Sequence, residues 1–358
     1  MGGNASHGVY RERMMVKFIS IFLTVSCFLQ AQVKIVKSIH IKSSIDHEGI
    51  PKLFDIYPPA IIYEGFSREI IVTRDTFFEV FDAKGRRIKK IGSRGQGPGD
   101  FNNIVSLTLY DGKYFFHDWI NKISVFTRRF EFEKSFYLGG GRNSQFIHSL
   151  DISEGRIYSV QNYLLKPKSR NYDHITVFNL TGKIMKHLFN SRTGLEHYKE
   201  ANLLSGRILA LNQRIFFCYF SIPKVWCLDP SGNILKTIHF GDKWWNPIIY
   251  DEREYRKRKE KYPTRALRDL LLSGDRIMKL YSWKNRILVQ VVKDPAEDNP
   301  KHGVVIFDQN LDILSPPVFY RDYHFCGTGE NLFFSRVIEG SAEGKFVKIE
   351  VLQCDYRF

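Results

Sequence analysis

The sequence predicts an all-β protein, a six-bladed β-propeller of four-stranded antiparallel blades with a helical insertion between blades four and five. Three observations support this prediction. A strand–turn–strand phrase occurs six times, a second apolar run precedes each copy, and the repeating unit is about 45 residues long, the size of a propeller blade. With 358 residues, of which 43% are hydrophobic and 15% aromatic, the chain can form one large β domain with a substantial core.

Each copy of the phrase consists of apolar residues, a turn containing Asp, Asn or Gly, and further apolar residues. Glycines such as Gly85 and Gly182 tolerate the positive φ of a tight hairpin turn. The run before each phrase supplies a second strand, as at 113–117, and the innermost strands come earlier still, as at 105–110. The six copies occupy residues 79–92, 124–139, 176–189, 225–241, 304–318 and 349–358.

Two of the units resemble each other closely, which indicates duplication. Residues 203–216 and 271–288 both begin Leu-Leu-Ser-Gly and continue with Arg, an apolar strand and Arg-Ile. An irregular β-sandwich is the alternative fold, but a sandwich needs no fixed unit length.

The segment 33–43 alternates polar and apolar residues and precedes the first unit, whereas the last copy stops at the chain end. We therefore expect this segment to complete the last blade and remove an exposed sheet edge.

The first residues have the features of an export signal. Lys17 precedes an apolar run over 18–25, and small or polar residues follow up to Ala31. We predict that residues 1–31 are a signal peptide with an over-extended start, because Met14 is a better start than Met1, and that 32–358 form the propeller. The apolar run is shorter than the roughly 20 residues that span a bilayer. Lipid anchoring through Cys27 is the alternative, and the expected location is periplasmic, cell-surface or secreted.

Charge and cysteine content limit the partners. The formal net charge of +15 favours acidic partners, and export argues against nucleic acid. The expected partner is an anionic glycan or an acidic peptide or protein. Four cysteines follow the signal segment, and either a disulfide or isolated buried thiols would suit them: Cys218, Cys227, Cys326 and Cys354.

Residues 91–101 (IGSRGQGPGDF) carry a resemblance to a known group. The loop, followed by an inner strand, Asp111-Gly112, a second strand and Asp118, resembles the exported bacterial members of the NHL and TolB-like superfamily of six-bladed β-propellers. A degraded copy lies at 138–146. The resemblance implies the propeller fold and leaves the activity open.

The glycine-rich loop has two possible roles. As a structural turn, it would let Phe101 fill the space between blades. As a ligand loop, its backbone amides would bind an anion beside Arg94. The loop lacks the Gly-Lys-Ser/Thr ending of a nucleotide-binding P-loop.

One face of the propeller should collect basic and aromatic loop residues. In a four-stranded antiparallel blade, the link between the second and third strands and the link to the next blade leave on the same side. Arg side chains bind carboxylates and aromatic rings stack on sugars, so this loop face is the predicted binding face. The ligand-binding candidates are Arg94, Trp119, Arg142, Trp244 and Trp245, among further loop residues Lys166, Lys168, Arg170, Arg192, His197, Lys243 and Arg321.

The insertion 244–269 departs from the strand pattern. Residues 251–261 place opposite charges at helical spacing, as in Glu254 with Arg258, and Pro263 would end the helix. It is either a solvated charged helix or a cap over the central channel.

No local catalytic motif is present in the sequence. We assign no catalytic residue, metal or cofactor, although His117, Asp118, His148 and Asp151 are metal-binding residue types near inner strands. We expect an exported binding or scaffold propeller that recognises an anionic, glycan or peptide ligand. A hydrolase or lyase of lactonase-like type is the alternative, and it would need residues from several blades to converge on the channel.

Overall fold

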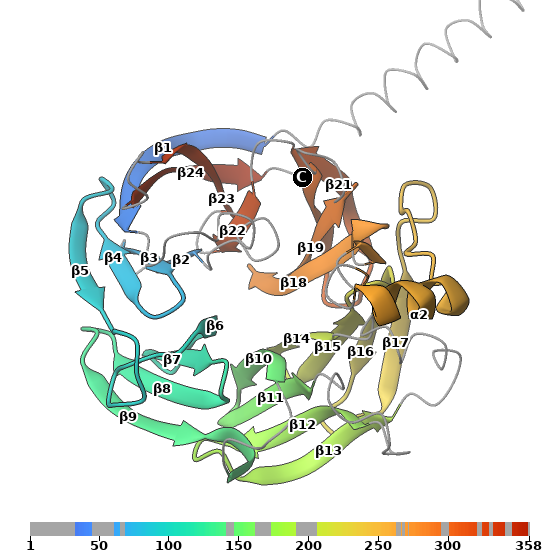
Figure 1. Ribbon diagram of the computed structural model, residues 1–358, viewed down its shortest axis with the longest axis horizontal. Coiled ribbons are helices and arrows are strands. Elements are labelled where there is room, and N and C mark those ends of the chain that lie inside the picture. The colour runs from blue at the N-terminus through green and yellow to red at the C-terminus, as the bar shows by residue number, and fades with distance from the viewer. Residues whose placement is uncertain are drawn as a thin grey trace, which may run out of the picture.

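The computed structural model shows an all-β propeller built from four-stranded antiparallel sheets arranged in a ring (Figure 1). It describes residues 33–44, 61–64, 69–140, 147–161, 173–190, 206–262, 266, 269–270, 272–294, 301–320, 324–328, 332–340 and 346–356. The predicted signal segment 1–31 lies outside these residues. Within the described ranges, the strands form six four-stranded sheets.

Five of the sheets use four strands consecutive in sequence. The first of these sheets contains β2 (Ile61–Glu64), β3 (Glu69–Thr73), β4 (Phe78–Phe81) and β5 (Arg87–Ile91). The second contains β6 (Ile104–Tyr110), β7 (Lys113–Asp118), β8 (Lys122–Thr127) and β9 (Phe132–Tyr137). A 3₁₀ turn, η2 (Leu138–Gly140), follows β9. The next contain β10 (Ile147–Ser153), β11 (Arg156–Gln161), β12 (Asp173–Asn179) and β13 (Ile184–Asn190), then β14 (Gly206–Leu211), β15 (Arg214–Tyr219), β16 (Lys224–Leu228) and β17 (Ile234–His239). The fifth contains β18 (Arg276–Trp283), β19 (Arg286–Lys293), β20 (Lys301–Phe307) and β21 (Ile313–Tyr320).

The two ends of the described chain share the remaining sheet. Its strands are β22 (His324–Thr328), β23 (Leu332–Gly340), β24 (Phe346–Tyr356) and β1 (Val33–Ser44). Strand β1 pairs antiparallel with β24, from Val33 opposite Tyr356 to Ser44 opposite Phe346, and the two lie side by side in Figure 1. The prediction that segment 33–43 joins the last sheet is confirmed.

The core lies between the sheets. Alternate residues of a strand point to opposite faces, so each sheet sends one set of apolar side chains toward the preceding sheet and another toward the following one. Phe116 of β7 packs with Phe78 of β4 in the preceding sheet, whereas Phe115 packs with Ile152 of β10 in the following sheet. This arrangement explains why the strands in the middle of each sheet are apolar along both faces.

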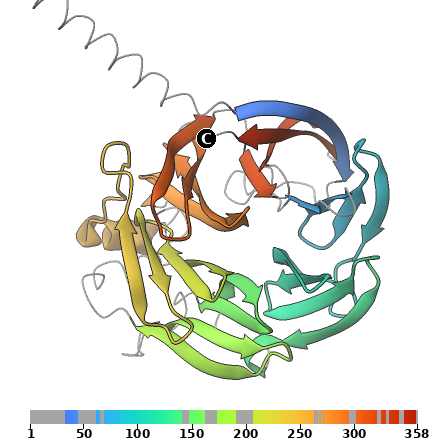
Figure 2. The same cartoon turned by 180° about the vertical axis from the view of Figure 1, so that it is seen from behind.

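Helix α2 (Glu252–Lys261) lies between β17 and β18. Asp251 caps its first turn by accepting a hydrogen bond from the Glu254 amide at 3.0 Å, and it ends before Pro263 as the sequence predicts. Figures 1 and 2 both place α2 at the outer rim of the ring. The alternative that this segment caps the central channel is therefore wrong, because the helix lies away from the centre of the ring.

Candidate functional site

The glycine-rich loop between β5 and β6 is a structural turn built around Phe101. The Phe101 ring is buried between Phe78 of β4 and Phe116 of β7. Gly92 has a φ of 95°, and a Cβ at this position would lie 2.7 Å from the Phe101 ring. The loop folds back on itself through a hydrogen bond from the Phe101 amide to the Ser93 carbonyl at 2.9 Å. The predicted placement of Phe101 between blades is confirmed.

Two buried charged side chains form hydrogen bonds with the backbone of this loop. Asp118 at the end of β7 accepts hydrogen bonds from the amides of Asn102, at 2.7 Å, and Asn103, at 3.0 Å. Lys122 at the start of β8 donates from Nζ to the carbonyl of Asp100 at 2.7 Å. Burial lowers the pKa of Lys122, while the carboxylates of Asp118 and Asp100 raise it. The ammonium group thus occupies the centre of the turn, and this favours the structural role of the loop over the anion-binding role.

Two of the predicted ligand residues remain on the surface of this region. Arg94 is exposed beside the buried Phe101. Trp119, in the link between β7 and β8, has 54% of its surface exposed, although its backbone amide is fixed by a 2.8 Å hydrogen bond to the Asn103 carbonyl. Both residues occupy links of the parity that we assigned to the loop face. Arg142 lies outside the described residues, as do Lys166, Lys168, Arg170, Arg192, His197 and Arg321.

Trp244 and Trp245 lie in the link between β17 and β18, on the loop face, but their rings are partly buried. Trp244 packs edge-on against Phe319 of β21, with ring centroids 5.3 Å apart, and both tryptophans contact Phe240. They cover the core cluster between the fourth and fifth sheets. The two rings therefore anchor the insertion, and only part of each remains available to a ligand.

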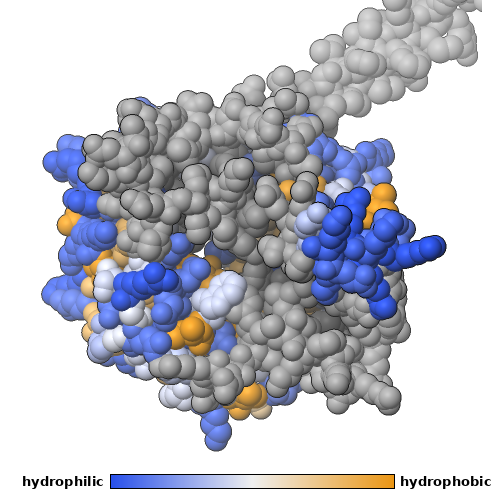
Figure 3. Space-filling model, viewed as in Figure 1, coloured by the Kyte–Doolittle hydropathy of each residue, from blue (hydrophilic) through white to orange (hydrophobic). Residues whose placement is uncertain are grey.

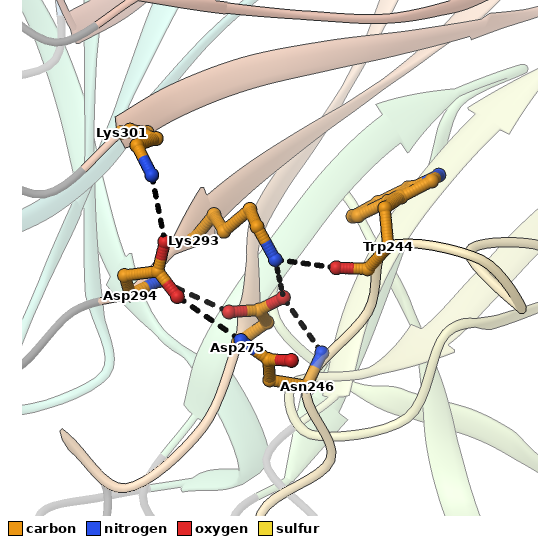
Figure 4. Close-up of polar contacts among 6 residues, drawn as sticks. All are labelled: Trp244, Asn246, Asp275, Lys293, Asp294 and Lys301. Carbon is orange, nitrogen blue, oxygen red and sulfur yellow. Dashed lines mark hydrogen bonds and ion pairs between the residues drawn. The ribbon is translucent and has the colours of Figure 1, made fainter.

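A buried carboxylate fixes the chain after these tryptophans (Figure 4). Asp275, which precedes β18, accepts hydrogen bonds from the amides of Asn246 at 2.8 Å and Asp294 at 3.0 Å. Lys293 lies 3.5 Å from the same carboxylate and also donates to the carbonyl of Trp244. Asp275 and Asp118 therefore have the same structural role. Each accepts hydrogen bonds from backbone amides of the loops on this face.

Charged side chains from three neighbouring sheets meet along the inner strands. Asp151 of β10 accepts a hydrogen bond from the amide of Ala210 of β14 at 2.8 Å. Arg207 of β14 donates from Nε to the carbonyl of Met278 of β18. Lys279 of β18 interacts electrostatically with both Asp151 and Arg207. We call Asp151, Arg207 and Lys279 the channel cluster.

The channel cluster has perturbed ionisation. Burial raises the pKa of Asp151 to about 6, and Lys279 opposes this effect. Burial lowers the pKa of Lys279, Asp151 raises it, and Arg207 lowers it further. Asp151 and Lys279 both keep partial contact with solvent, whereas Arg207 is buried. Two cationic side chains and one carboxylate give the cluster a net positive charge when all three are ionised, and this charge favours an anionic group.

The sequence contained a signal for part of this cluster. The duplicated Leu-Leu-Ser-Gly segments place Arg207 and Arg276 at the start of two neighbouring inner strands. The guanidinium carbons of both lie near the ring of Phe220, at 5.4 Å and 5.9 Å from its centroid. The duplication was assigned to architecture alone, and so the candidate set omitted these arginines and Lys279.

The candidate metal residues do not gather into a metal site within the described part of the chain. Asp118 and Asp151 accept hydrogen bonds from backbone amides, as described above. His117 is fully buried, and burial lowers its pKa to about 4, so its imidazole is neutral near pH 7. The side chain of His148 lies outside the described residues.

The cysteines of adjacent strands β15 and β16 are free thiols. Cys218 pairs with Val225 and Cys227 with Phe216, so the two cysteines are offset by two positions along the ladder. Both are buried and unbridged, and burial raises the pKa of Cys218 to about 12. Isolated buried thiols, one of the two predicted alternatives, are therefore present at these positions.

The fold is similar to solved structures from Bacteroides. A member of the DUF4221 family from Bacteroides vulgatus has a TM-score of 0.59 at 11% identity, covering 91% of this chain and 99% of that one. A Bacteroides fragilis protein predicted to be exported has a TM-score of 0.57 at 12% identity, covering 89% and 96%. No protein-family model and no curated protein matches the sequence. At these identities the likeness shows the fold alone, and the affiliation with the NHL and TolB-like superfamily stays a prediction.

Proposed function

We propose that this chain is an exported, non-catalytic six-bladed propeller that binds an anionic, glycan or peptide ligand on its loop face. The six four-stranded sheets of the described residues support the ring of six blades. The apolar segment 18–25 behind Lys17 supports export to the periplasm or cell surface, as does the similar Bacteroides fragilis protein. None of the helices in the described residues has the length and hydrophobicity that crossing a bilayer requires.

The channel cluster carries this proposal. A propeller ring closes through apolar contacts between its sheets, and it needs no charges along the inner strands for that purpose. Lys279 nevertheless lies close enough to Asp151 and Arg207 to interact electrostatically with both, and removing charged groups from water in this way costs free energy that closure of the ring does not explain. An anionic ligand would offset that cost by pairing with Lys279.

The exposed residues of the loop face would extend the site outward. Trp119 offers an exposed aromatic ring for a sugar, and Arg94 offers a guanidinium group for a carboxylate. Arg142 belongs to the same proposed set. Trp244 and Trp245 would contribute only the exposed parts of rings whose main contacts lie in the core.

One observation favours the alternative of a propeller hydrolase or lyase. The pKa of Asp151 is raised and that of Lys279 is lowered, which moves both groups toward the range in which they can exchange protons at neutral pH. Asp151 and Lys279 would then exchange protons with a bound anionic substrate in addition to binding it.

Calorimetric titration with three probes tests the proposal: oligogalacturonate as an anionic glycan, polyglutamate as an acidic peptide, and maltohexaose as a neutral glycan. Lys279→Gln should weaken binding of the anionic probes about 10-fold or more, because it removes a partly desolvated charge. Lys84→Gln, a change at an exposed turn on the opposite face, should leave binding unchanged. Equal binding of the anionic probes to the parent and the Lys279 variant would contradict the proposed site, and turnover of any probe would favour the enzyme.

A further inference from the structure

The ammonium group of Lys279 differs from those of the other partly buried lysines described above. Lys122 and Lys293 each donate from Nζ to a backbone carbonyl. Lys279 forms no hydrogen bond or ion pair with any residue that the structure describes, and its Nζ lies over the ring of Tyr281, 4.9 Å from the centroid. A lysine that stabilises a fold from a desolvated position binds an acceptor there. The position of Lys279 is therefore not explained by structure alone.

The backbone places a second cation beside Lys279. The pairing of β18 with β19 shifts register between Ile277 and Lys279, so Met278 is the extra residue of a β-bulge. Arg207 of β14 donates from Nε to the carbonyl of Met278, which directly precedes Lys279 in the chain. This hydrogen bond fixes the guanidinium group next to the backbone that carries Lys279. Bulges are common beside functional sites, where they change the direction of a side chain.

These surroundings favour the neutral amine of Lys279. Burial lowers its pKa, Asp151 raises it, and Arg207 lowers it. A lysine that is desolvated and lies beside another cation is the kind that attacks carbonyl groups. Strand β18 borders the centre of the ring in Figure 1, and Lys279 keeps partial contact with solvent, so a small molecule in the channel can reach it.

We propose that Lys279 forms an imine with an aldehyde or ketone that enters the channel. The Nζ lone pair attacks the carbonyl carbon to form a C–N bond, and one proton moves from the nitrogen to the former carbonyl oxygen. A second proton, from the carboxyl group of Asp151, then lets this hydroxyl leave as water when the C–O bond breaks. The product is a protonated imine beside the Asp151 carboxylate. Burial raises the pKa of Asp151 to about 6, which suits it to this donation.

The remaining charge of the cluster selects the class of carbonyl compound. Arg207 stays cationic at neutral pH, and it lies beside the amine that reacts. It therefore favours an aldehyde or ketone that also carries a carboxylate. This preference rests on the proposed function, in which the cluster binds an anion, whereas the formation of the imine does not.

Reductive trapping with cyanoborohydride at pH 7 tests the imine on the unaltered protein. Pyruvate is the probe with a ketone and a carboxylate, and hydroxyacetone is its neutral counterpart. Hydrophilic residues cover much of the described surface in Figure 3, and exposed lysines are present there, so peptide mass spectrometry must locate the label.

An ordinary lysine is neutral in about 1 of 2,500 molecules at pH 7, and each unit by which its pKa falls raises this fraction about tenfold. Lys279 should therefore react with pyruvate about 10-fold faster or more than the exposed Lys84, and this ratio should be smaller with hydroxyacetone. Equal rates at the two lysines, or label on Lys84 and none on Lys279, would overturn the inference. Equal ratios for the two probes would overturn the preference for a carboxylate.

Calorimetry with K279R separates the imine from the binding of an anion. Arginine keeps the positive charge but does not form an imine, and lactate has the carboxylate of pyruvate without its ketone. The parent should bind pyruvate about 5-fold or more tightly than lactate, a difference of about 1 kcal/mol, and K279R should bind both alike. Circular dichroism melts of K279R beside the parent check that the fold is kept.

The two proposals fail in different ways. Equal affinity of the parent for pyruvate and lactate, with no trapped adduct, would overturn the imine, while the Lys279→Gln titration with oligogalacturonate could still support the anion site. Trapping at Lys279 together with unchanged oligogalacturonate binding by Lys279→Gln would overturn the anion site and support the imine.

Discussion

Lys186 of β13 donates a hydrogen bond from Nζ to the carbonyl oxygen of Pro230 in the next sheet, at 2.6 Å. The same contact recurs around the ring. Lys89 of β5 donates to the carbonyl of Arg129 at 2.8 Å, and Lys236 of β17 lies 2.9 Å from the carboxylate of Asp312. The three lysines occupy equivalent register positions, opposite Val80, Val177 and Cys227 of their third strands. Each ties an outer strand to the outer turn of the following sheet.

Replacing Lys186 with Met should therefore destabilise the propeller by about 1 kcal/mol, because the Pro230 carbonyl loses a charged donor at a partly exposed position. Lys183→Met, three residues earlier and exposed, is the matched control and should change the free energy of unfolding by less than about 0.5 kcal/mol. Urea denaturation measures both. Equal effects of the two substitutions would show that the contact contributes nothing.

The tryptophans of the loop face should behave as two classes. Trp244→Ala should cost about 3 kcal/mol of stability, because it removes contacts with Phe240 and Phe319 and leaves a cavity. Trp119→Ala should change the melting temperature less than Trp244→Ala does and should reduce ligand binding, because 54% of the surface of Trp119 is exposed. Thermal melts read beside titrations with oligogalacturonate distinguish the classes. A stable Trp244 variant with impaired binding would reverse the assignment.

Asp151 and His117 should give the protein opposing pH dependences. Between about pH 4 and pH 6, folded Asp151 retains a proton that the unfolded chain releases, because its pKa is raised to about 6. Its contribution to stability is present at low pH and is lost as the pH rises through about 6. His117 acts in the opposite direction. Its pKa is lowered to about 4, so the unfolded chain takes up the proton first, and its contribution is lost as the pH falls.

Asp151→Asn should therefore increase the free energy of unfolding by about 2 kcal/mol at pH 7, since Asn still accepts the Ala210 amide without the buried charge. The variant should also become more stable as the pH rises from 4.5 to 6.5, because the substitution removes the opposing effect of Asp151 and leaves that of His117. Urea titrations across this range measure the slope. A variant less stable than the parent at pH 7 would indicate that the attraction of Lys279 exceeds the cost of burying the carboxylate.

The buried pair beneath the glycine-rich loop should be strongly coupled. Asp118→Asn should cost about 3 kcal/mol, because it removes the carboxylate that stabilises the buried ammonium group of Lys122 most and leaves only the weaker effect of Asp100. Adding Lys122→Met should recover part of this loss, so that the double variant is more stable than the sum of the two single changes predicts. A double-mutant cycle by urea denaturation gives the coupling. Simple additivity would show that the two side chains act independently.

The features that the sequence predicted depend on local pattern, and the missed ones depend on the relative positions of sheets. The pairing of β1 follows from alternating residues beside an incomplete last unit, and helix α2 follows from charge spacing and Pro263. The packing of Trp244 depends on Phe319, which belongs to a distant part of the chain. The channel cluster likewise requires three inner strands to be placed together, and no single repeat contains more than part of it.

The pairing of β1 with β24 sets the order in which the molecule can be completed. Val33 finds its partner, Tyr356, only after nearly the whole chain has been synthesised, and if the chain is exported, only after nearly all of it has crossed. Contacts so distant in sequence are costly to close and form slowly. Until then the first and last strands are both unpaired edges that other chains could join. The closed ring protects the finished protein, but until it closes, the chain can aggregate through these edges. During that period, dilution or a chaperone that binds β1 would determine the yield of folded protein.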